Sequence, residues 1–185
     1  MKNIKCVLVG DEGVGKTWLI RTYISGSVPP GDVNTVFDTY QKTCEYKNED
    51  YKLDLWDTSG HPDYYRLRKL SYLNSDVILI CYAVNRVTSF RNAITRWMDE
   101  VEQYGCPVIL VGTKADTRGD LEKDEDMVRS EMVHREKGKV HDTIECSAIE
   151  RLNINELFEI VIKATIEEKP KTKWWWFLCG CCIRK

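Results

Sequence analysis

Residues 10–17 read Gly10-Asp11-Glu12-Gly13-Val14-Gly15-Lys16-Thr17, which matches the phosphate-loop pattern G-x-x-x-x-G-K-[ST]. The apolar run at residues 6–9 stands directly before this motif and predicts a buried strand, and residues 17–23 are compatible with a helix. The motif therefore occupies a strand-to-helix turn, where its glycines let successive backbone N–H groups form a nest for anions. We expect Lys16 to reach the outer phosphates of a nucleotide and Thr17 to offer its hydroxyl to Mg²⁺. A chance match is the alternative, and the motifs that follow weaken it.

The composition fits one folded domain followed by a short tail. The chain has 185 residues, of which 43% are hydrophobic, and a formal net charge of −2. Residues 169–185 carry five cations and no acid, so residues 1–168 are acidic overall. This balance gives no support to a nucleic-acid partner. Residues 1–5 lead straight into the first strand without the apolar core of a signal peptide, so we expect synthesis in the cytosol.

Eight cysteines raise the question of disulfides, but most of their positions favour free thiols. Five of them stand singly in or beside strand-like segments, where cysteine behaves as a small hydrophobic residue. We expect these five to be buried thiols: Cys6, Cys44, Cys81, Cys106 and Cys146. The other three crowd the tail and need a separate explanation: Cys179, Cys181 and Cys182.

The hydrophobic pattern predicts strands that alternate with helices. Strands are expected at residues 2–9, 40–47, 51–57, 76–84, 107–111 and 143–146. Helices are expected at residues 17–23, 90–104 (capped by Thr88 or Ser89) and 154–165 (with Asn153 and Glu156 as a capping box). The second and third strands form a hairpin with its turn at residues 48–50, whereas we expect residues 61–74 to be mobile and residues 117–137 to be exposed. The fold class is thus α/β: a P-loop three-layer domain with a mostly parallel six-stranded sheet, one antiparallel hairpin strand and helices on both faces.

A second motif, Thr113-Lys114-Ala115-Asp116, follows the fifth strand and indicates which base binds. The Asp116 carboxylate can accept two donors from guanine, whereas adenine presents the opposite pattern on that edge. We expect Lys114 to lay its stem over the base, and Ser147-Ala148 to offer a backbone N–H to the guanine oxygen. Each short polar loop is weak evidence alone, so the prediction rests on their order and spacing. An ATP-using enzyme is disfavoured, because Asp116 and Lys114 suit adenine poorly.

Together these motifs resemble the Ras superfamily of small GTPases over roughly residues 3–168. The residues that carry the resemblance are the phosphate loop, Thr35, Asp57-Thr58-Ser59-Gly60, Thr113-Lys114-Ala115-Asp116 and Ser147-Ala148. The Rho/Rac branch is resembled most in residues 35–40, Trp56 and residues 64–72. We therefore expect a small GTPase domain at residues 1–168 and a membrane-targeting tail at residues 169–185.

The resemblance implies a switch that binds GTP or GDP with Mg²⁺ and hydrolyses GTP. It implies that Thr17 and Thr35 bind Mg²⁺ directly and that Asp57 holds the ion through water. Thr35 would also contact the terminal phosphate, which the Gly60 N–H would sense. The nucleotide would contact Gly13, Val14, Gly15, Lys16, Thr17, Val28, Thr35, Gly60, Thr113, Lys114, Asp116, Ser147 and Ala148.

The same resemblance makes residues 27–40 and 58–73 two switch regions, ordered by GTP and released on hydrolysis. Exchange factors and effectors would bind these regions, and effectors would contact Asp38 and Tyr40. By family analogy they would act on the actin cytoskeleton or on membrane traffic. Three tyrosines are expected to contact partners rather than to pack internally: Tyr64, Tyr65 and Tyr72. The chain itself is expected to be a monomer.

The residues expected to act in hydrolysis are Lys16, Gly60, Glu12 and His61, and the last two depart from the family pattern. Glu12 stands where most members have glycine, so its carboxylate would crowd the terminal phosphate and the path of an arginine finger. His61 replaces the glutamine that orients the attacking water, and Ser59 replaces an alanine. We expect slow intrinsic and activator-stimulated hydrolysis. The alternative is that Glu12 turns to solvent and His61 substitutes adequately.

Two further departures concern how tightly the nucleotide is held. Val28 replaces an aromatic residue that packs against guanine, and Asp32 replaces a tyrosine that closes over the phosphates. Losing one aromatic contact costs on the order of 1 kcal/mol or more, which is enough to speed release by roughly tenfold. Fast exchange and slow hydrolysis both predict a GTP-bound resting state. A non-cycling scaffold that holds GTP permanently is the alternative function.

The segment at residues 117–139 takes the place of the Rho insert helix and is shorter than usual.

The tail reads Trp174-Trp175-Trp176-Phe177-Leu178-Cys179-Gly180-Cys181-Cys182-Ile183, which is too short to span a bilayer. Tryptophans favour the membrane interface and the flanking cations favour anionic leaflets. Residues 182–185 have the length of a prenylation box, but Arg184 is polar where an aliphatic residue is needed. We therefore expect palmitoylation of the tail cysteines and attachment to the cytoplasmic face of the plasma membrane or an endomembrane. An aromatic patch that docks on another protein is the alternative.

Overall fold

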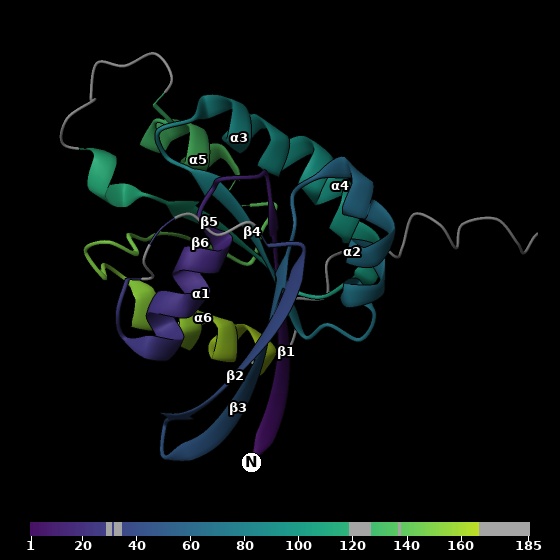
Figure 1. Ribbon diagram of the computed structural model, residues 1–185, viewed down its shortest axis with the longest axis vertical. Coiled ribbons are helices and arrows are strands. Elements are labelled where there is room, and N and C mark those ends of the chain that lie inside the picture. Colours follow the sequence, from purple (N-terminus) through teal and green to yellow (C-terminus); the bar gives the residue numbers. More distant parts are fainter. Residues whose placement is uncertain (29–30, 32–34, 119–126, 137, 167–185) are drawn as a thin grey trace, which may run out of the picture.

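A six-stranded sheet organises the protein (Figure 1). The computed structural model describes residues 1–28, 31, 35–118, 127–136 and 138–166. The strands are β1 (Lys2–Gly10), β2 (Phe37–Tyr46), β3 (Glu49–Thr58), β4 (Val77–Ala83), β5 (Val108–Thr113) and β6 (Asp142–Glu145). They lie in the order β2-β3-β1-β4-β5-β6, and all neighbours are parallel except the antiparallel pair β2 and β3. This confirms the predicted mostly parallel sheet with one antiparallel strand.

Helices cover both faces of the sheet. The pair α1 (Lys16–Ser25) and α6 (Ile154–Ile166) packs on one face. The other face carries α2 (Tyr65–Tyr72), α3 (Val87–Asn92), α4 (Met98–Val101) and α5 (Ser130–Glu136). A π-helical stretch, Ala93–Trp97, joins α3 to α4, and short 3₁₀ turns occur at Pro62–Tyr64, Glu102–Tyr104 and Ala115–Arg118. The predicted three layers are therefore present.

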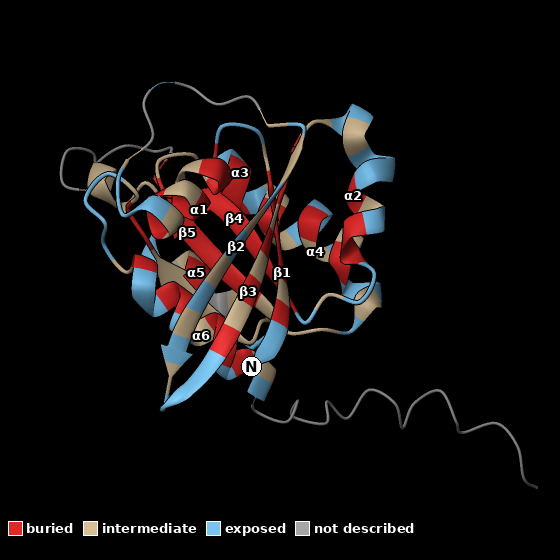
Figure 2. Ribbon diagram, turned by 60° about the horizontal axis from the view of Figure 1, so that its bottom comes forward, coloured by how far each residue is buried: buried red, intermediate tan, exposed pale blue. Residues whose placement is uncertain are grey.

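The core exists because the central strands are apolar on both faces. Successive side chains of a strand point to opposite faces. Along β1, Leu8 joins the apolar cluster beneath α1 and α6, whereas Val7 and Val9 join the cluster beneath α2 to α5. All seven residues of β4 are buried, and Figure 2 shows the buried residues concentrated in the central strands. This rigid sheet fixes the positions of the loops at its edge.

Three details differ from the sequence predictions. The hairpin turns at Lys47 and Asn48, both with positive φ, because a two-residue turn of that hand matches the twist of the strands. The long helix begins at Val87, and the Ser89 hydroxyl instead accepts the N–H of Ala83 at 3.0 Å. Residues 61–74 contain α2, which the weak periodicity did not reveal because the residues that it buries include Arg68 rather than an apolar stripe. Mobility of that segment stays a prediction.

The prediction of an exposed segment at residues 117–137 is wrong in part. Met127, Val128 and Val133 are buried in the cluster beneath α2 to α5. The Val128 N–H donates to the carbonyl of Val84 at 2.8 Å, so this stretch is bound to the end of β4. Three apolar residues within a charged stretch were too few to produce a recognisable hydrophobic periodicity. Residues 119–126 and 137 lie outside the described residues.

The described cysteines are free thiols, as predicted. Cys6, Cys81 and Cys146 are buried, whereas Cys44 and Cys106 are only half-buried, which corrects the prediction for those two. The tail cysteines and the proposed domain boundary at residue 168 fall beyond residue 166, outside the described residues. Among the residues that the structure describes, every helix is too short or too polar to cross a membrane.

Candidate nucleotide-binding site

A cavity of about 950 Å³ opens at the carboxyl ends of the strands, a volume that suits a small-molecule ligand. Parallel strands bring these ends to one edge of the sheet, so loops from distant parts of the chain meet there. Twelve of the predicted site residues line the cavity: Glu12, Gly13, Gly15, Lys16, Thr17, Thr35, Gly60, His61, Thr113, Lys114, Asp116 and Ala148. Both predicted motifs therefore contribute to a single site.

The phosphate loop connects β1 to α1 in the predicted strand-to-helix turn. Gly13 and Gly15 have φ of 69° and 97°, backbone conformations that favour glycine. The Lys16 ammonium lies within the loop and donates to the carbonyls of Gly10 and Asp11, each at 2.9 Å. Burial lowers the pKa of Lys16. An anion bound in the loop would offset this desolvation, because it would favour the charged ammonium.

Three oxygen-bearing side chains meet at the start of α1. The Thr17 hydroxyl donates to Asp57 Oδ2 at 2.5 Å and lies 2.8 Å from the Thr35 hydroxyl. Asp57 Oδ1 is shielded from solvent and has no hydrogen-bond partner among the described residues. Burial raises the pKa of Asp57, since its charge lacks a full counterpart. Hydroxyl and carboxylate oxygens are the ligands that Mg²⁺ prefers, so this donor set fits the predicted ion.

Gly60 brings the segment after β3 against the phosphate loop. A Cβ at this position would lie 2.5 Å from the Glu12 nitrogen and 2.5 Å from the Gly10 carbonyl oxygen. Only glycine allows so close an approach. The backbone at Gly60 is therefore in direct contact with the phosphate loop.

Glu12 and His61 line the cavity but are held loosely. The Glu12 side chain is exposed and forms no ion pair with any residue that the structure describes. The His61 side chain is 43% exposed. Its Nδ1 accepts the Asp63 N–H at 3.3 Å, and its ring lies edge-on to Tyr64 with centroids 6.1 Å apart. The contacts of the His61 ring therefore stay within its own segment.

The main chain around His61 is, by contrast, firmly anchored by Arg68. Arg68 Nη1 donates to the carbonyls of Ser59 at 2.9 Å and His61 at 2.8 Å. Its Nε donates to Glu100 Oε1 at 3.0 Å, and both side chains of this ion pair are buried. The Tyr72 hydroxyl donates to the same Glu100 oxygen at 2.7 Å.

This network corrects one prediction about the tyrosines of the second switch. Tyr72 is 1% exposed, so it packs internally and is not a partner contact. Its ring also lies against Tyr104. Tyr65 is 42% exposed and Tyr64 is half-buried, so both remain accessible to a partner.

The other end of the cavity gathers the residues predicted to bind the base. The Ser147 hydroxyl donates to Asp116 Oδ1 at 2.5 Å, which joins the two predicted loops. The Ala115 N–H donates to the carbonyl of Cys146 at 3.1 Å, and Lys114 has a φ of 60°. The Asp116 carboxylate is thereby held in place, as recognition of two neighbouring donors on a base requires.

Thr113 ties this end to the phosphate loop. Its hydroxyl lies between the carbonyls of Val14 and Tyr82, at 2.9 Å from the latter. Val14 is fully buried and is not among the residues that line the cavity, so its contact with the nucleotide stays a prediction. Val28 is half-buried and is not among the residues that line the cavity. Asp32 lies outside the described residues.

The predicted effector residues lie together on β2. The Tyr40 hydroxyl donates to Asp38 Oδ2 at 2.7 Å and accepts a hydrogen bond from Arg21 Nε at 3.1 Å. Arg21 comes from α1, so the first switch is attached to the helix that follows the phosphate loop. Asp38 and Tyr40 therefore form one polar surface with Arg21.

Sequence reasoning missed the contacts that support the phosphate loop from behind. Asp11 accepts hydrogen bonds from Asn92 Nδ2 and from Trp97 Nε1, each at 2.8 Å. Arg86 Nη2 donates to the carbonyl of Glu12, also at 2.8 Å. Asp11 occupies a variable position of the motif, so only its pairing with a buried tryptophan 86 residues away could have revealed its role.

Comparisons with known proteins agree with this arrangement. The sequence model of the Ras family matches residues 5–167. The Ras-like GTP-binding protein RHO1 of Entamoeba histolytica is 40% identical over 174 residues, which cover 93% of this chain and 80% of that protein. The Ras-like GTP-binding protein RhoL of Drosophila melanogaster is 38% identical over 91% of this chain and 90% of its own length. The GTP-binding protein Rho1 of Kluyveromyces lactis is 39% identical over 91% and 89%, respectively.

Proposed function

Since the chain belongs to the Rho branch of the Ras superfamily of small GTPases, we propose that it is a guanine-nucleotide switch that hydrolyses GTP slowly and rests with GTP bound. The ligands are GTP or GDP with Mg²⁺. The ion would be held by Thr17, Thr35 and Asp57, and its charge would neutralise the phosphate oxygens. Lys16 would bind the outer phosphates, and Asp116 would accept the two donors of guanine.

The proposal of slow hydrolysis rests on one observation: Glu12 and His61 both line the cavity. Phosphoryl transfer depends on positioning and on stabilisation of negative charge. The Glu12 carboxylate adds negative charge and bulk in this part of the cavity, so it crowds the path of an arginine finger even when its side chain turns away from the terminal phosphate. The His61 ring contacts Asp63 and Tyr64, and it forms no hydrogen bond across the cavity to any other residue that the structure describes, so its orientation toward a water molecule is not fixed.

Fast release of the bound nucleotide would also favour a GTP-bound resting state. Val28 offers less packing to a base than an aromatic ring, and Asp32 cannot close over the phosphates as a tyrosine does. Cells hold more GTP than GDP, so an empty site refills mainly with GTP. Fast exchange and slow hydrolysis therefore act in the same direction.

The second candidate is a non-cycling scaffold that holds GTP permanently and uses its switch surfaces as a fixed binding face. The Arg68 network favours this candidate, because it fixes the main chain at Ser59 and His61 through contacts within the chain itself. Turnover separates the two functions. A switch converts its GTP within the lifetime of a signal, whereas a scaffold still carries GTP after that time.

The partners proposed for the switch surfaces are exchange factors and effectors that act on the actin cytoskeleton or membrane traffic. The surface for effectors includes Asp38 and Tyr40, together with the exposed residues Val36, Leu67 and Leu70 of the two switches. Apolar side chains that stay exposed beside polar ones are typical of an interaction surface. The chain would act as a monomer.

We further propose that the tail, residues 169–185, attaches the protein to the cytoplasmic face of a membrane. Its tryptophans, cations and palmitoylated cysteines would combine several weak signals into stable binding. Hydroxylamine cleaves thioesters, so it should move the cellular protein from the membrane fraction to the soluble fraction. A protein that stays on the membrane after this treatment excludes anchoring through palmitoyl groups.

The nucleotide carried in cells tests the proposed function. The protein is isolated rapidly from growing cells in Mg²⁺, and the bound nucleotides are separated by chromatography. We expect guanine nucleotides with more GTP than GDP. The Glu12→Gly, His61→Gln double variant is the matched control and should carry mainly GDP. A native protein that carries mainly GDP, or an adenine nucleotide, contradicts the proposal.

A further inference from the structure

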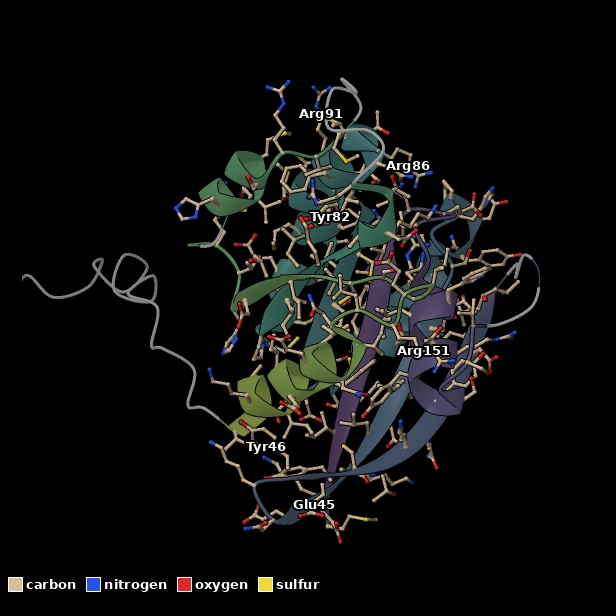
Figure 3. The ribbon with its side chains drawn as sticks, turned by 90° about the vertical axis from the view of Figure 1, so that its left-hand side faces the viewer. Glu45, Tyr46, Tyr82, Arg86, Arg91 and Arg151 are labelled. Atoms are coloured by element: carbon tan, nitrogen blue, oxygen red, sulfur yellow. The ribbon has the colours of Figure 1, made fainter. Side chains whose placement is uncertain are left out.

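Arg86 lies directly beside the residue that departs most from the family pattern. It follows β4 and precedes the first residue of α3. Its Nη2 donates to the carbonyl oxygen of Glu12 at 2.8 Å, although the two residues are 74 positions apart. Figure 3 labels Arg86 at the end of the molecule opposite the hairpin residues Glu45 and Tyr46. A guanidinium is therefore placed next to the phosphate loop.

This guanidinium has donors that are not used. Arg86 Nε is shielded from solvent and has no hydrogen-bond partner among the described residues. A guanidinium presents five N–H donors in a fixed fork, and a shielded donor without an acceptor is unfavourable. The surroundings of Arg86 therefore favour an anion that approaches it.

The other charged side chains of the phosphate loop are already occupied. The Asp11 carboxylate accepts hydrogen bonds from Asn92 and Trp97, one on each oxygen. The Lys16 ammonium is bound to the carbonyls of Gly10 and Asp11. This leaves the Glu12 carboxylate, which is exposed and without an ion pair in the described part of the chain.

Rotation of the Glu12 side chain offers its carboxylate two directions. The guanidinium is bound to the carbonyl of Glu12 itself, and a glutamate side chain turns among staggered rotamers about its single bonds. In one direction its carboxylate enters the cavity, where a terminal phosphate repels it. In the other direction it meets a cation with free donors.

We propose that Arg86 is a positioning residue that draws the Glu12 carboxylate away from the terminal phosphate when a nucleoside triphosphate binds. This pairing explains how the chain tolerates an acidic side chain in its phosphate loop. The pairing raises the affinity for the triphosphate relative to the diphosphate, because a diphosphate has no terminal phosphate charge to repel Glu12. The inference rests on the proposed function, since it requires that the cavity binds GTP.

The test compares the affinities of the purified full chain for GDP and for the slowly hydrolysed analogue GTPγS, both with Mg²⁺. The variants are Arg86→Gln, Arg86→Lys, Glu12→Ala and the double change Arg86→Gln with Glu12→Ala. We expect Arg86→Gln to weaken GTPγS about fivefold relative to GDP, the size of a partly exposed charge pair. Arg86→Lys should lose less, because it keeps the charge. In the Glu12→Ala background, Arg86→Gln should no longer change the ratio.

Two results overturn the inference. Arg86→Gln could weaken both nucleotides equally, or it could change the ratio equally in the Glu12→Ala background. The first result assigns Arg86 to support of the loop alone, and the second assigns it an effect on the bound triphosphate that does not require Glu12. Rapid hydrolysis of GTP by the native chain would overturn the proposed slow turnover without affecting these ratios. Failure of the native chain to bind either nucleotide would overturn the proposed function itself.

Discussion

The two ends of one cavity are built differently. Where the nucleotide would be held, side chains are fixed by hydrogen bonds from other elements: Thr17 to Asp57, and Ser147 to Asp116. At the corner where hydrolysis is proposed to occur, Glu12 is exposed, and among the described residues the His61 side chain has hydrogen-bond and ring contacts only with Asp63 and Tyr64. Binding requires that ligand-contacting groups be fixed before the ligand arrives, and hydrolysis requires the same of the groups that orient water. The chain meets the first requirement better than the second.

The largest effect is expected at the boundary between these regions, where Arg68 holds the main chain of Ser59 and His61. Replacing one member of a buried ion pair leaves an unpaired charge, so Arg68→Met should lower the free energy of unfolding by about 3 kcal/mol. Urea unfolding at a fixed, saturating GDP concentration measures this. The double change Arg68→Met with Glu100→Leu should recover part of the loss. A cost below about 1 kcal/mol for the single change would show that the segment is not anchored as described.

A substitution in the proposed metal site should give the next largest effect, on the rate of GDP release. Asp57→Asn removes the buried charge that fits Mg²⁺, so GDP should leave about 100-fold faster, as expected for the loss of a strong charged interaction. Release of a fluorescent GDP analogue measures the rate. Chelation with EDTA should accelerate release from the native protein to a similar extent and have little further effect on the variant. An equal acceleration of both proteins by EDTA would place the ion elsewhere.

A substitution at the end of the cavity that is predicted to bind the base should change the nucleotide specificity. Asp116→Asn removes an acceptor for guanine and presents a donor to xanthine, so GTP affinity should fall about 30-fold while xanthosine triphosphate binds more tightly. Competition against a labelled nucleotide measures both changes, with ATP as the control that binds neither protein. Retention of full GTP affinity by the variant would mean that Asp116 does not contact the base.

The smallest effect is expected at His61. Its side chain is 43% exposed and, among the described residues, has no hydrogen bond, ion pair or ring contact outside residues 61–64. His61→Ala should therefore change the free energy of unfolding by less than about 0.5 kcal/mol and nucleotide affinity by less than about twofold. Thermal unfolding and GDP binding measure these quantities. A loss above about 1.5 kcal/mol would mean that the corner is as firmly held as the rest of the site.

The sequence predicted those parts of the fold and the site that are encoded locally. The phosphate loop is a single continuous stretch of sequence, and so is the Thr113–Asp116 motif. Each follows an apolar strand, so their positions at the edge of the sheet could be inferred. The mostly parallel sheet with one antiparallel strand was predicted from the alternation of strands and helices and from the hairpin pattern, but the order of the strands was not predicted. Roles of the individual site residues remain predictions.

The contacts that could not be predicted join segments far apart in the chain. Tyr72 was expected to face partners, but Glu100, 28 residues later, binds its hydroxyl within the core. Helix α2 escaped notice because the residues that it buries include a charged one, Arg68, whose partners are also remote. The contact between Arg86 and Glu12 depends on how α3 packs beside the loop. None of these contacts leaves a periodic or motif signal.

Hydrolysis of preloaded GTP in a single turnover, with Mg²⁺ present, tests the central claim most directly. The native chain is compared with Glu12→Gly, His61→Gln and the double variant. We expect the double variant to hydrolyse GTP at least about 100-fold faster than the native chain, the effect typical of a restored catalytic group. Each single change should recover only part of this rate. A native chain that hydrolyses GTP as fast as the double variant would contradict the account and identify a conventional cycling switch.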